Sequence, residues 1–239
     1  MRIGLLECDH VDASLRHVAG DYADMFARLF RTHAPELTLQ RHDVAAGDPL
    51  PSPDTADGWV ITGSRHGVHD TGVPWIGRLV DFVRTADEEA VPVVGICFGH
   101  QLLAHAHGGE VRRAAHGWGV GVHEAEVDAP APWMAPDRPH FRLLVSHQDQ
   151  VERLPDGAVR LATSRHAPVA AFCHRRSLGF QGHPEFVPAY AEALMGARVE
   201  RIGAPVVEAA RATLDTPTDS GIVARWIANF LRDGARAPA

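Results

Sequence analysis

The sequence predicts a doubly wound α/β domain with a mostly parallel sheet, helices on both faces and an antiparallel extension. Short apolar strands alternate with amphipathic helices over roughly the first hundred residues. Several short strand candidates without intervening helices follow. Hydrophobic residues make up 45% of 239 residues, which is enough for a sizeable core.

Composition excludes several classes of protein. The net charge of -7 argues against binding nucleic acid or an anionic membrane. No apolar run reaches the roughly 20 residues of a membrane span, and Glu7 interrupts the N-terminal apolar run too early for a signal peptide. We therefore expect a cytoplasmic location. The sequence has three cysteines and no lysine, which excludes a disulfide framework, Schiff-base chemistry and a lysine phosphate clamp.

The predicted elements follow the hydrophobic periodicity. The first part alternates in order: strand 2–7, helix 14–33, strand 37–42, loop 47–57, strand 58–64, helix 75–89, strand 91–96 and helix 98–107. The strand candidates of the middle are 120–127, 141–146, 159–163, 169–174 and 177–181. Residues 188–214 are expected to be mostly helical, and 221–231 to form a final helix. We expect one domain over 1–234 and a frayed tail over 235–239.

Cys97 lies in a Gly-x-Cys-x-Gly turn between a buried strand and a helix. This is the nucleophile elbow with cysteine in place of serine. Such a turn lifts the nucleophile above the carboxyl end of the sheet and sets it at a helix N-terminus, where a thiolate is favoured. The alternative is a buried structural cysteine, which this motif alone leaves about equally plausible.

A base for this nucleophile is offered by His183, and Glu185 lies two residues further on. Side chains two apart in an extended chain point the same way, so the carboxylate can orient the imidazole. Taken alone, His183 and Glu185 are better explained as a loop histidine and a surface glutamate than as a catalytic pair. The backbone amides after Thr62 could complete an oxyanion hole, although this segment alone is weak evidence.

Together these segments resemble the class I glutamine amidotransferases, especially stand-alone proteins related to the amidotransferase domain of GMP synthase. The resemblance runs in order over nearly the whole chain. Its segments are Val60–Ser64, Pro74–Ile76, Gly95–Ala104, Ser146–Val151 and Gly182–Phe186. It implies a flavodoxin-like fold, no cofactor and no bound metal.

The resemblance also implies roles for single residues. Cys97 attacks the γ-carbonyl of glutamine, His183 moves the proton to the leaving amine, and Glu185 orients His183. A γ-glutamyl thioester forms and is hydrolysed to glutamate. The backbone of Gly63, Ser64 and Phe98 forms the oxyanion hole, and the substrate-binding residues are Gln101, His147, Gln148 and Asp149.

Two departures from the family pattern lie where the substrate binds. Ser64 replaces the second of two usual glycines, and Gln148 stands where glycine is frequent. Serine restricts the backbone angles that glycine permits. Because of these departures, the sequence does not establish that the substrate is strictly glutamine.

Several alternatives remain open at this level. Ammonia could be released or passed to a separate synthase, because the sequence holds no phosphate loop and no apparent second domain. A γ-glutamyl peptidase would use the same chemistry on larger leaving groups. A catalytically idle binding module on the same fold is a different class of protein. An α/β-hydrolase is disfavoured, since that fold places its acid before its histidine.

Other signals have plainer interpretations. Histidines such as His105 and His107 diverge on a helix and do not predict a zinc site. Cys8 and Cys173 are expected to be small core residues. The pairs Arg112-Arg113 and Arg175-Arg176 are expected in solvated turns that could meet a partner subunit. The oligomeric state is not predicted.

Overall fold

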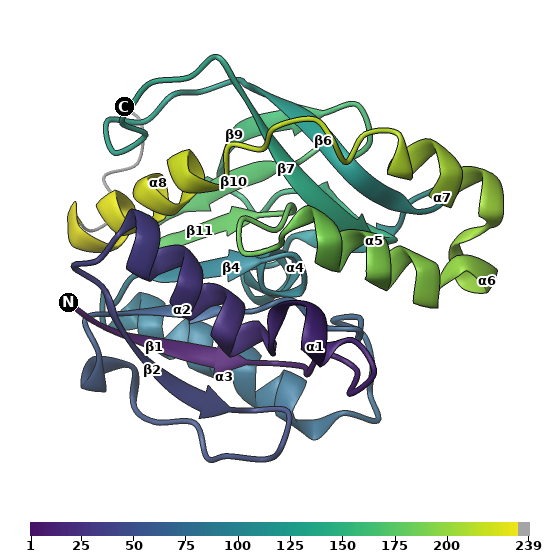
Figure 1. Cartoon of the computed structure of the whole chain (residues 1–239). Coiled ribbons are helices and arrows are strands. Elements are labelled where there is room, and N and C mark those ends of the chain that lie inside the picture. Colours follow the sequence, from purple (N-terminus) through teal and green to yellow (C-terminus); the bar gives the residue numbers. More distant parts are fainter. Residues whose placement is uncertain (234–239) are drawn as a thin grey trace.

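The computed structural model describes residues 1–233 and has a nine-stranded mixed sheet covered by helices (Figure 1). Its strand order is β2-β1-β3-β4-β11-β10-β9-β6-β7. The bounds of these strands are Arg2–Glu7 (β1), Thr38–Asp43 (β2), Gly58–Ile61 (β3), Val93–Ile96 (β4), Gly119–Val127 (β6), His140–His147 (β7), Val159–Ser164 (β9), Ala171–His174 (β10) and Ser177–Phe180 (β11). The predicted α/β fold is confirmed.

The helices, in chain order, are Arg16–Ala19 (α1), Tyr22–His33 (α2), Pro74–Glu88 (α3), Phe98–Ala106 (α4), Pro188–Ala197 (α5), Val199–Ile202 (α6), Ala204–Arg211 (α7) and Ser220–Asp233 (α8). A short 3₁₀ helix covers Pro53–Thr55 within the predicted loop. The expected tail over 235–239 lies outside the described residues, and the single-domain interpretation of 1–234 stays a prediction.

The sheet has two halves of different character. From β2 to β11 neighbouring strands run parallel, with Leu5 opposite Val60 and Val94 opposite Leu178. From β11 to β7 each strand runs antiparallel to its neighbour. The antiparallel half is the predicted extension of the sheet. Because open α/β sheets bind ligands at the carboxyl ends of their parallel strands, this edge is where a site is expected.

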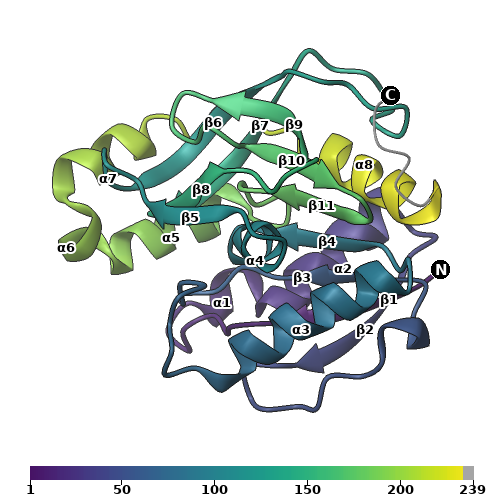
Figure 2. The same ribbon diagram turned by 180° about the vertical axis from the view of Figure 1, so that it is seen from behind.

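Helices pack on both faces of the parallel half (Figures 1 and 2). On one face α2 and α8 contribute Phe26 and Trp226 to a core that includes Leu5. On the other face α3 and α4 contribute Leu79 and Leu102. The central strands are buried on both sides, which is why β3 and β4 consist almost wholly of apolar residues.

The predicted helix over 14–33 is wrong in its middle, because two helices form there. Gly20 ends α1 with a φ of 80°, a conformation that glycine adopts at little cost. Asp21 then caps α2, and Asp24 completes the capping box by accepting the N–H of Asp21. The apolar periodicity continues across the break, so periodicity alone did not reveal it.

The mostly helical stretch 188–214 holds three helices, α5, α6 and α7, which bends the chain around one end of the sheet. Gly203, with a φ of 99°, separates α6 from α7. None of the helices within residues 1–233 has both the length and the apolar character that crossing a bilayer demands.

A second, two-stranded sheet was not predicted. It pairs Glu110–Arg113 (β5) with Asp149–Arg153 (β8) in antiparallel register. Polar residues dominate both strands, so neither shows the apolar run that marks a buried strand. The interpretation of Arg112-Arg113 as a turn is therefore wrong, since both residues lie on β5. The Ser146–Val151 segment of the family resemblance runs from the end of β7 into β8, with only Gln148 between the strands.

Candidate active site

Cys97 stands at a strained turn at the carboxyl end of β4. Its φ of 52° and ψ of -101° are unusual for a residue with a side chain, and it caps the N-terminus of α4. The chain passes very close to itself at this turn, and the flanking glycines leave room for that approach. A Cβ on Gly95 would lie 2.3 Å from the carbonyl carbon of Gly99. The Gly-x-Cys-x-Gly pattern therefore reflects close backbone packing around Cys97.

His183 reaches the same point from the antiparallel half of the molecule. The N–H of Cys97 donates to the carbonyl of Phe180 at 2.9 Å, which joins the elbow to the end of β11. The N–H of His183 donates to the carbonyl of Leu144 at 2.8 Å, so β7 fixes the segment after β11. The Cys97 side chain is close enough to the imidazole of His183 to raise its pKa.

Glu185 lies on the far side of the imidazole. Its Oε1 is 2.7 Å from His183 Nδ1, and both side chains are almost fully buried. Phe186 stacks on the imidazole with ring centroids 3.8 Å apart. The structure thus brings Cys97, His183 and Glu185 together in the order that a nucleophile, its base and an orienting carboxylate require.

The charge state of His183 follows from its neighbours. Burial disfavours the protonated ring, but Glu185 and Cys97 outweigh burial and raise the pKa of His183 to about 10. The imidazole is therefore protonated at neutral pH. A protonated imidazole at this position can donate its proton to a leaving group.

The segment after β3 lies against this group. A Cβ on Gly63 would lie 2.9 Å from Cε1 of His183 and 3.7 Å from Cβ of Cys97. Glycine is needed at this position because a side chain would push the imidazole away. Ser64 has no positive φ, so its side chain is compatible with the loop. Neither Ser64 N–H nor Phe98 N–H, at the start of α4, donates to another group within residues 1–233.

This loop is held by the residues that follow β1, which the sequence interpretation did not identify. Ser64 Oγ donates to the carbonyl of Cys8 at 3.0 Å. Asp9 accepts the N–H of Arg65 at 2.8 Å and the Arg65 guanidinium at 2.9 Å. A carboxylate two residues after a predicted strand was the only signal for Asp9 in the sequence.

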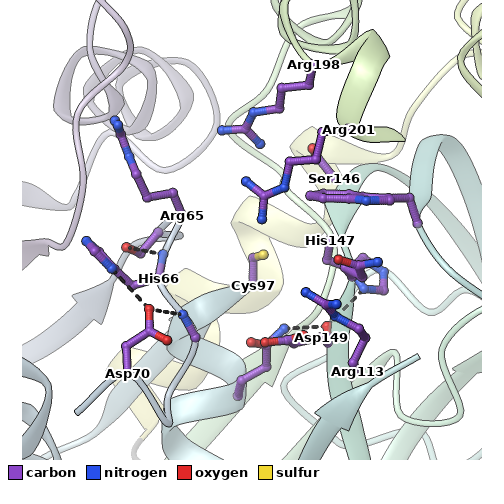
Figure 3. Close-up of a pocket in the computed structure, with 15 residues that line it drawn as sticks. Arg65, His66, Asp70, Cys97, Arg113, Ser146, His147, Asp149, Arg198 and Arg201 are labelled. Atoms are coloured by element: carbon purple, nitrogen blue, oxygen red, sulfur yellow. Dashed lines mark hydrogen bonds and ion pairs between the residues drawn. The ribbon is translucent and has the colours of Figure 1, made fainter. Parts of the chain in front are cut away.

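A cavity of about 190 Å³ opens above Cys97 (Figure 3). Its lining is mostly polar and comes from five separate parts of the chain. The residues are Ser64, Arg65, His66, Gly67, Asp70, Cys97, Gln101, Arg113, Trp118, Ser146, His147, Gln148, Asp149, Arg198 and Arg201. His183 and Glu185 do not line it and lie buried behind the nucleophile.

All four residues predicted to bind the substrate line this cavity. Gln101 Nε2 donates to the carbonyl of Asp149 at 2.7 Å and to Gln181 Oε1 at 3.2 Å. With both amide protons used, Gln101 Oε1 is left to accept a hydrogen bond. Gln148 is anchored through its carbonyl, which accepts the N–H of Ala114 at 2.8 Å.

His147 is neutral in this wall. Burial, together with the neighbouring His166, lowers the pKa of His147 well below its usual value. Its Nδ1 is 3.1 Å from the carbonyl of Asp149, so Nδ1 carries the proton and Nε2 is the acceptor. The ring therefore shapes the cavity and adds no charge.

Among the cavity residues that were not predicted as site residues are Arg113, Trp118, Arg198 and Arg201. Arg113 ends β5, whereas Arg198 lies between α5 and α6 and Arg201 lies within α6. No motif surrounds these residues, and exposed arginines are common on helices.

One further group could in principle hold a metal. Glu7, His10 and Asp43 follow or end β1 and β2, and their ligand atoms lie close together. Arg41 already forms ion pairs with Glu7 and with Asp43, and His10 Nε2 is 3.0 Å from Asp43. These internal partners satisfy the carboxylates. None of the three residues lines the cavity above Cys97, so the expectation of no bound metal stays a prediction.

Comparison with known proteins finds a family model and several relatives that match this chain. The model of the family "Glutamine amidotransferase class-I" matches residues 20–197. γ-Glutamyl peptidase 4 of Arabidopsis thaliana is 38% identical over 137 residues, which is 54% of this chain and 54% of that protein. A GMP synthase of Thermomicrobium roseum is 37% identical over 129 residues, covering 54% of this chain but 23% of the synthase.

The fold is also found among solved structures. A glutamine amidotransferase from Thermotoga maritima superimposes with a TM-score of 0.78 at 19% identity, covering 97% of this chain and 98% of that one. At this identity the likeness shows the fold alone. The family model spans most of the sequence and includes the elbow, His183 and Glu185. The chain belongs to the class I glutamine amidotransferase family.

Proposed function

We propose that this chain hydrolyses the γ-carboxamide of glutamine, or a related γ-glutamyl amide, through a thioester on Cys97. The observation that carries the proposal is the meeting of a strained, buried cysteine with His183 and Glu185. The triad assignment rests on this arrangement and on membership of the family.

In the first step the Cys97 sulfur attacks the γ-carbonyl carbon. The carbonyl oxygen becomes negative and accepts hydrogen bonds from the backbone N–H groups of Ser64 and Phe98. His183 then gives its proton to the leaving nitrogen as the carbon–nitrogen bond breaks. The products of this step are ammonia or an amine and a γ-glutamyl thioester.

In the second step His183, now neutral, accepts a proton from water. The hydroxide attacks the thioester carbon, glutamate leaves, and the sulfur and imidazole return to their starting state. Glu185 holds the Nδ1 proton throughout, which keeps Nε2 directed at the reacting atoms. Burial of Glu185 and the stacked Phe186 restrict the movement of the ring.

Recognition of the glutamyl group is assigned to the wall opposite the oxyanion loop. Gln101 Oε1 is left without a partner from its own amide protons and can accept the α-ammonium group. The backbone around Gln148 and Asp149 would bind the α-carboxylate, as in the family resemblance. Gln101 is itself positioned by Asp149 and Gln181.

A γ-glutamyl peptidase is the second candidate. Relatives with that name are among the most similar proteins, and arginines line the cavity beyond the groups needed for glutamine. Delivery of ammonia to a separate synthase subunit is the third outcome of the same chemistry. The match to a GMP synthase covers 23% of that protein, which is a reason to search for a separate synthase partner. A cytoplasmic location stays a prediction.

The test is a panel of donors: glutamine, γ-glutamyl anilide and glutathione, each with wild type and Cys97→Ser. We expect release of ammonia or amine and, after acid quenching, a γ-glutamyl adduct on the peptide that contains Cys97. A wild-type protein that releases nothing from any donor would indicate the idle binding module. Hydrolysis of p-nitrophenyl esters alone would indicate an esterase.

A further inference from the structure

Three arginines on the wall of the cavity have no carboxylate partner in the described part of the chain. Arg113, Arg198 and Arg201 line the same cavity as Cys97, and none forms an ion pair with a carboxylate within residues 1–233. Arg65, the fourth arginine of the lining, is bound by Asp9. Guanidinium groups that share a cavity repel one another, so their placement favours an anion between them.

The carboxylates in the same lining do not neutralise these arginines. Asp70 is 3.2 Å from His66. Asp149 lies opposite Arg113 in the register of β5 and β8, but no ion pair joins them. The whole protein carries a net charge of -7, so the positive charge in this cavity opposes the overall sign. Clefts of one sign concentrate ligands of the opposite sign.

Two of the three arginines come from one short segment. Arg198 lies between α5 and α6, and Arg201 lies within α6. The Arg201 guanidinium lies over the Trp118 ring, 5.0 Å from its centroid, which holds it on the cavity wall. An arginine that is held in place loses less entropy when it binds a carboxylate through two hydrogen bonds.

The arginines lie on opposite sides of the nucleophile. Figure 3 shows Arg198 and Arg201 above the Cys97 sulfur and Arg113 below it, beside Asp149. Asp149, whose carbonyl accepts a hydrogen bond from Gln101, lies on this lower side, where the α-groups of a γ-glutamyl substrate would bind. Arg113 can thus serve the α-carboxylate of the glutamyl group. Arg198 and Arg201 have no corresponding group to bind in glutamine, whose leaving group is ammonia.

We propose that Arg198 and Arg201 form a subsite for a carboxylate on the leaving group. The preferred substrate is then a γ-glutamyl amino acid or peptide with a free C-terminal carboxylate. This inference rests on the proposed function, and it selects the peptidase over the glutaminase. Water and the γ-glutamyl compound give glutamate and the free amino acid or peptide. The γ-amide bond breaks, and the leaving nitrogen takes the proton from His183.

Two donors of nearly equal size distinguish the effect of substrate charge from the effect of substrate shape. They are γ-glutamylglycine and its C-terminal amide. We expect wild type to prefer the free acid by roughly tenfold or more in kcat/KM, the range of one charge-assisted contact. The double variant Arg198→Gln, Arg201→Gln should lose this preference, mainly through a higher KM for the acid. Raising the salt concentration should weaken the preference in wild type.

The control is Arg225→Gln on α8, which makes the same type of substitution at one exposed position outside the cavity. It should keep the wild-type preference. A double variant that keeps the preference, or a wild type that treats acid and amide alike, would overturn the subsite.

Binding separates the subsite from the chemistry. Calorimetry with the Cys97→Ala protein should show tighter binding of the acid than of the amide, and the two Arg-to-Gln changes should abolish the difference. Equal binding of both compounds contradicts the subsite even if wild type hydrolyses them. Preferential binding of the acid without hydrolysis of any donor would contradict the proposed function and support the subsite. Binding of neither compound, with arginine-dependent binding of a candidate synthase instead, would overturn the subsite in favour of a protein interface.

Discussion

Cys8 and Cys97 each follow a parallel strand of the same sheet by one residue, yet their surroundings differ. Cys8 follows β1, and its sulfur donates to the carbonyl of Leu6 at 3.4 Å. Burial raises the pKa of the Cys8 thiol far above its usual value. Cys97 follows β4 at a turn with positive φ, at the start of a helix and beside a protonated imidazole.

The comparison separates two conditions for a reactive cysteine. The carboxyl end of a parallel strand is shared by both residues, so this position alone does not make a nucleophile. Cys97 additionally lines the cavity and is 5% exposed, whereas Cys8 is fully buried. Cys8 instead contributes its backbone to the loop that carries Ser64. One strand end therefore positions the loop, and the other carries the sulfur.

The largest expected effect is the loss of hydrolysis in Cys97→Ala. Without the sulfur no thioester forms, and kcat for any γ-glutamyl donor should fall by at least roughly 10³-fold. Cys8→Ala should keep most of the activity and lose roughly 1 kcal/mol of stability, because it removes one buried atom. Steady-state rates and denaturant unfolding of both variants test the contrast. Similar rates in the two variants would remove the distinction.

The second effect concerns Glu185, the carboxylate of the histidine–carboxylate pair beside Cys97. Glu185→Gln keeps the shape of the side chain but not the charge that favours the imidazolium. We expect kcat to fall by about 10²- to 10⁴-fold, as for neutral replacements of an orienting carboxylate. Glu152→Gln, on β8 and outside the cavity lining, is the matched control and should leave kcat near the wild-type value. A wild-type rate in Glu185→Gln would remove Glu185 from the mechanism.

The third prediction follows from the raised pKa of His183. A group whose pKa is higher in the folded protein stabilises the fold fully below its unfolded pKa of about 6.5. This contribution is lost as pH rises towards the folded value of about 10. Wild type should therefore lose more free energy of unfolding between pH 6.5 and pH 10 than Glu185→Gln does. Equal losses in urea unfolding at the two pH values would contradict the assigned cause.

The smallest effects concern the turn itself. Gly95→Ala introduces a Cβ 2.3 Å from the Gly99 carbonyl carbon, and we expect a cost of roughly 1–3 kcal/mol from overpacking. A Cβ added to Gly77 on α3 would meet no atom within 4 Å. Gly77→Ala should thus raise stability by about 0.5–1 kcal/mol. Thermal unfolding checks both signs, and a harmless Gly95→Ala would contradict the tight packing of the elbow.

Much of the candidate site was predictable because its signals are local. The elbow around Cys97 occupies five consecutive residues, and His183 and Glu185 lie two apart. Helices with a clear apolar stripe, such as α3 and α8, were also predicted close to their observed bounds. The break at Gly20 was not, since the apolar pattern continues across it. Polar strands β5 and β8 gave no periodic signal, so their pairing was missed.

Local patterns in the chain were sufficient to establish the fold class, the nucleophile and the residue types able to serve it, because these depend on strand and helix periodicity and on short motifs. Packing of distant segments was needed to establish that Asp9 holds the Ser64 loop and that Arg113, Arg198 and Arg201 meet around one cavity. Asp9, Arg113 and the segment with Arg198 and Arg201 lie far apart in the chain. Nothing in the sequence around an exposed arginine shows which surface it lies on. Charge recognition depends on distances between side chains, and those distances arise only when distant strands and helices pack together.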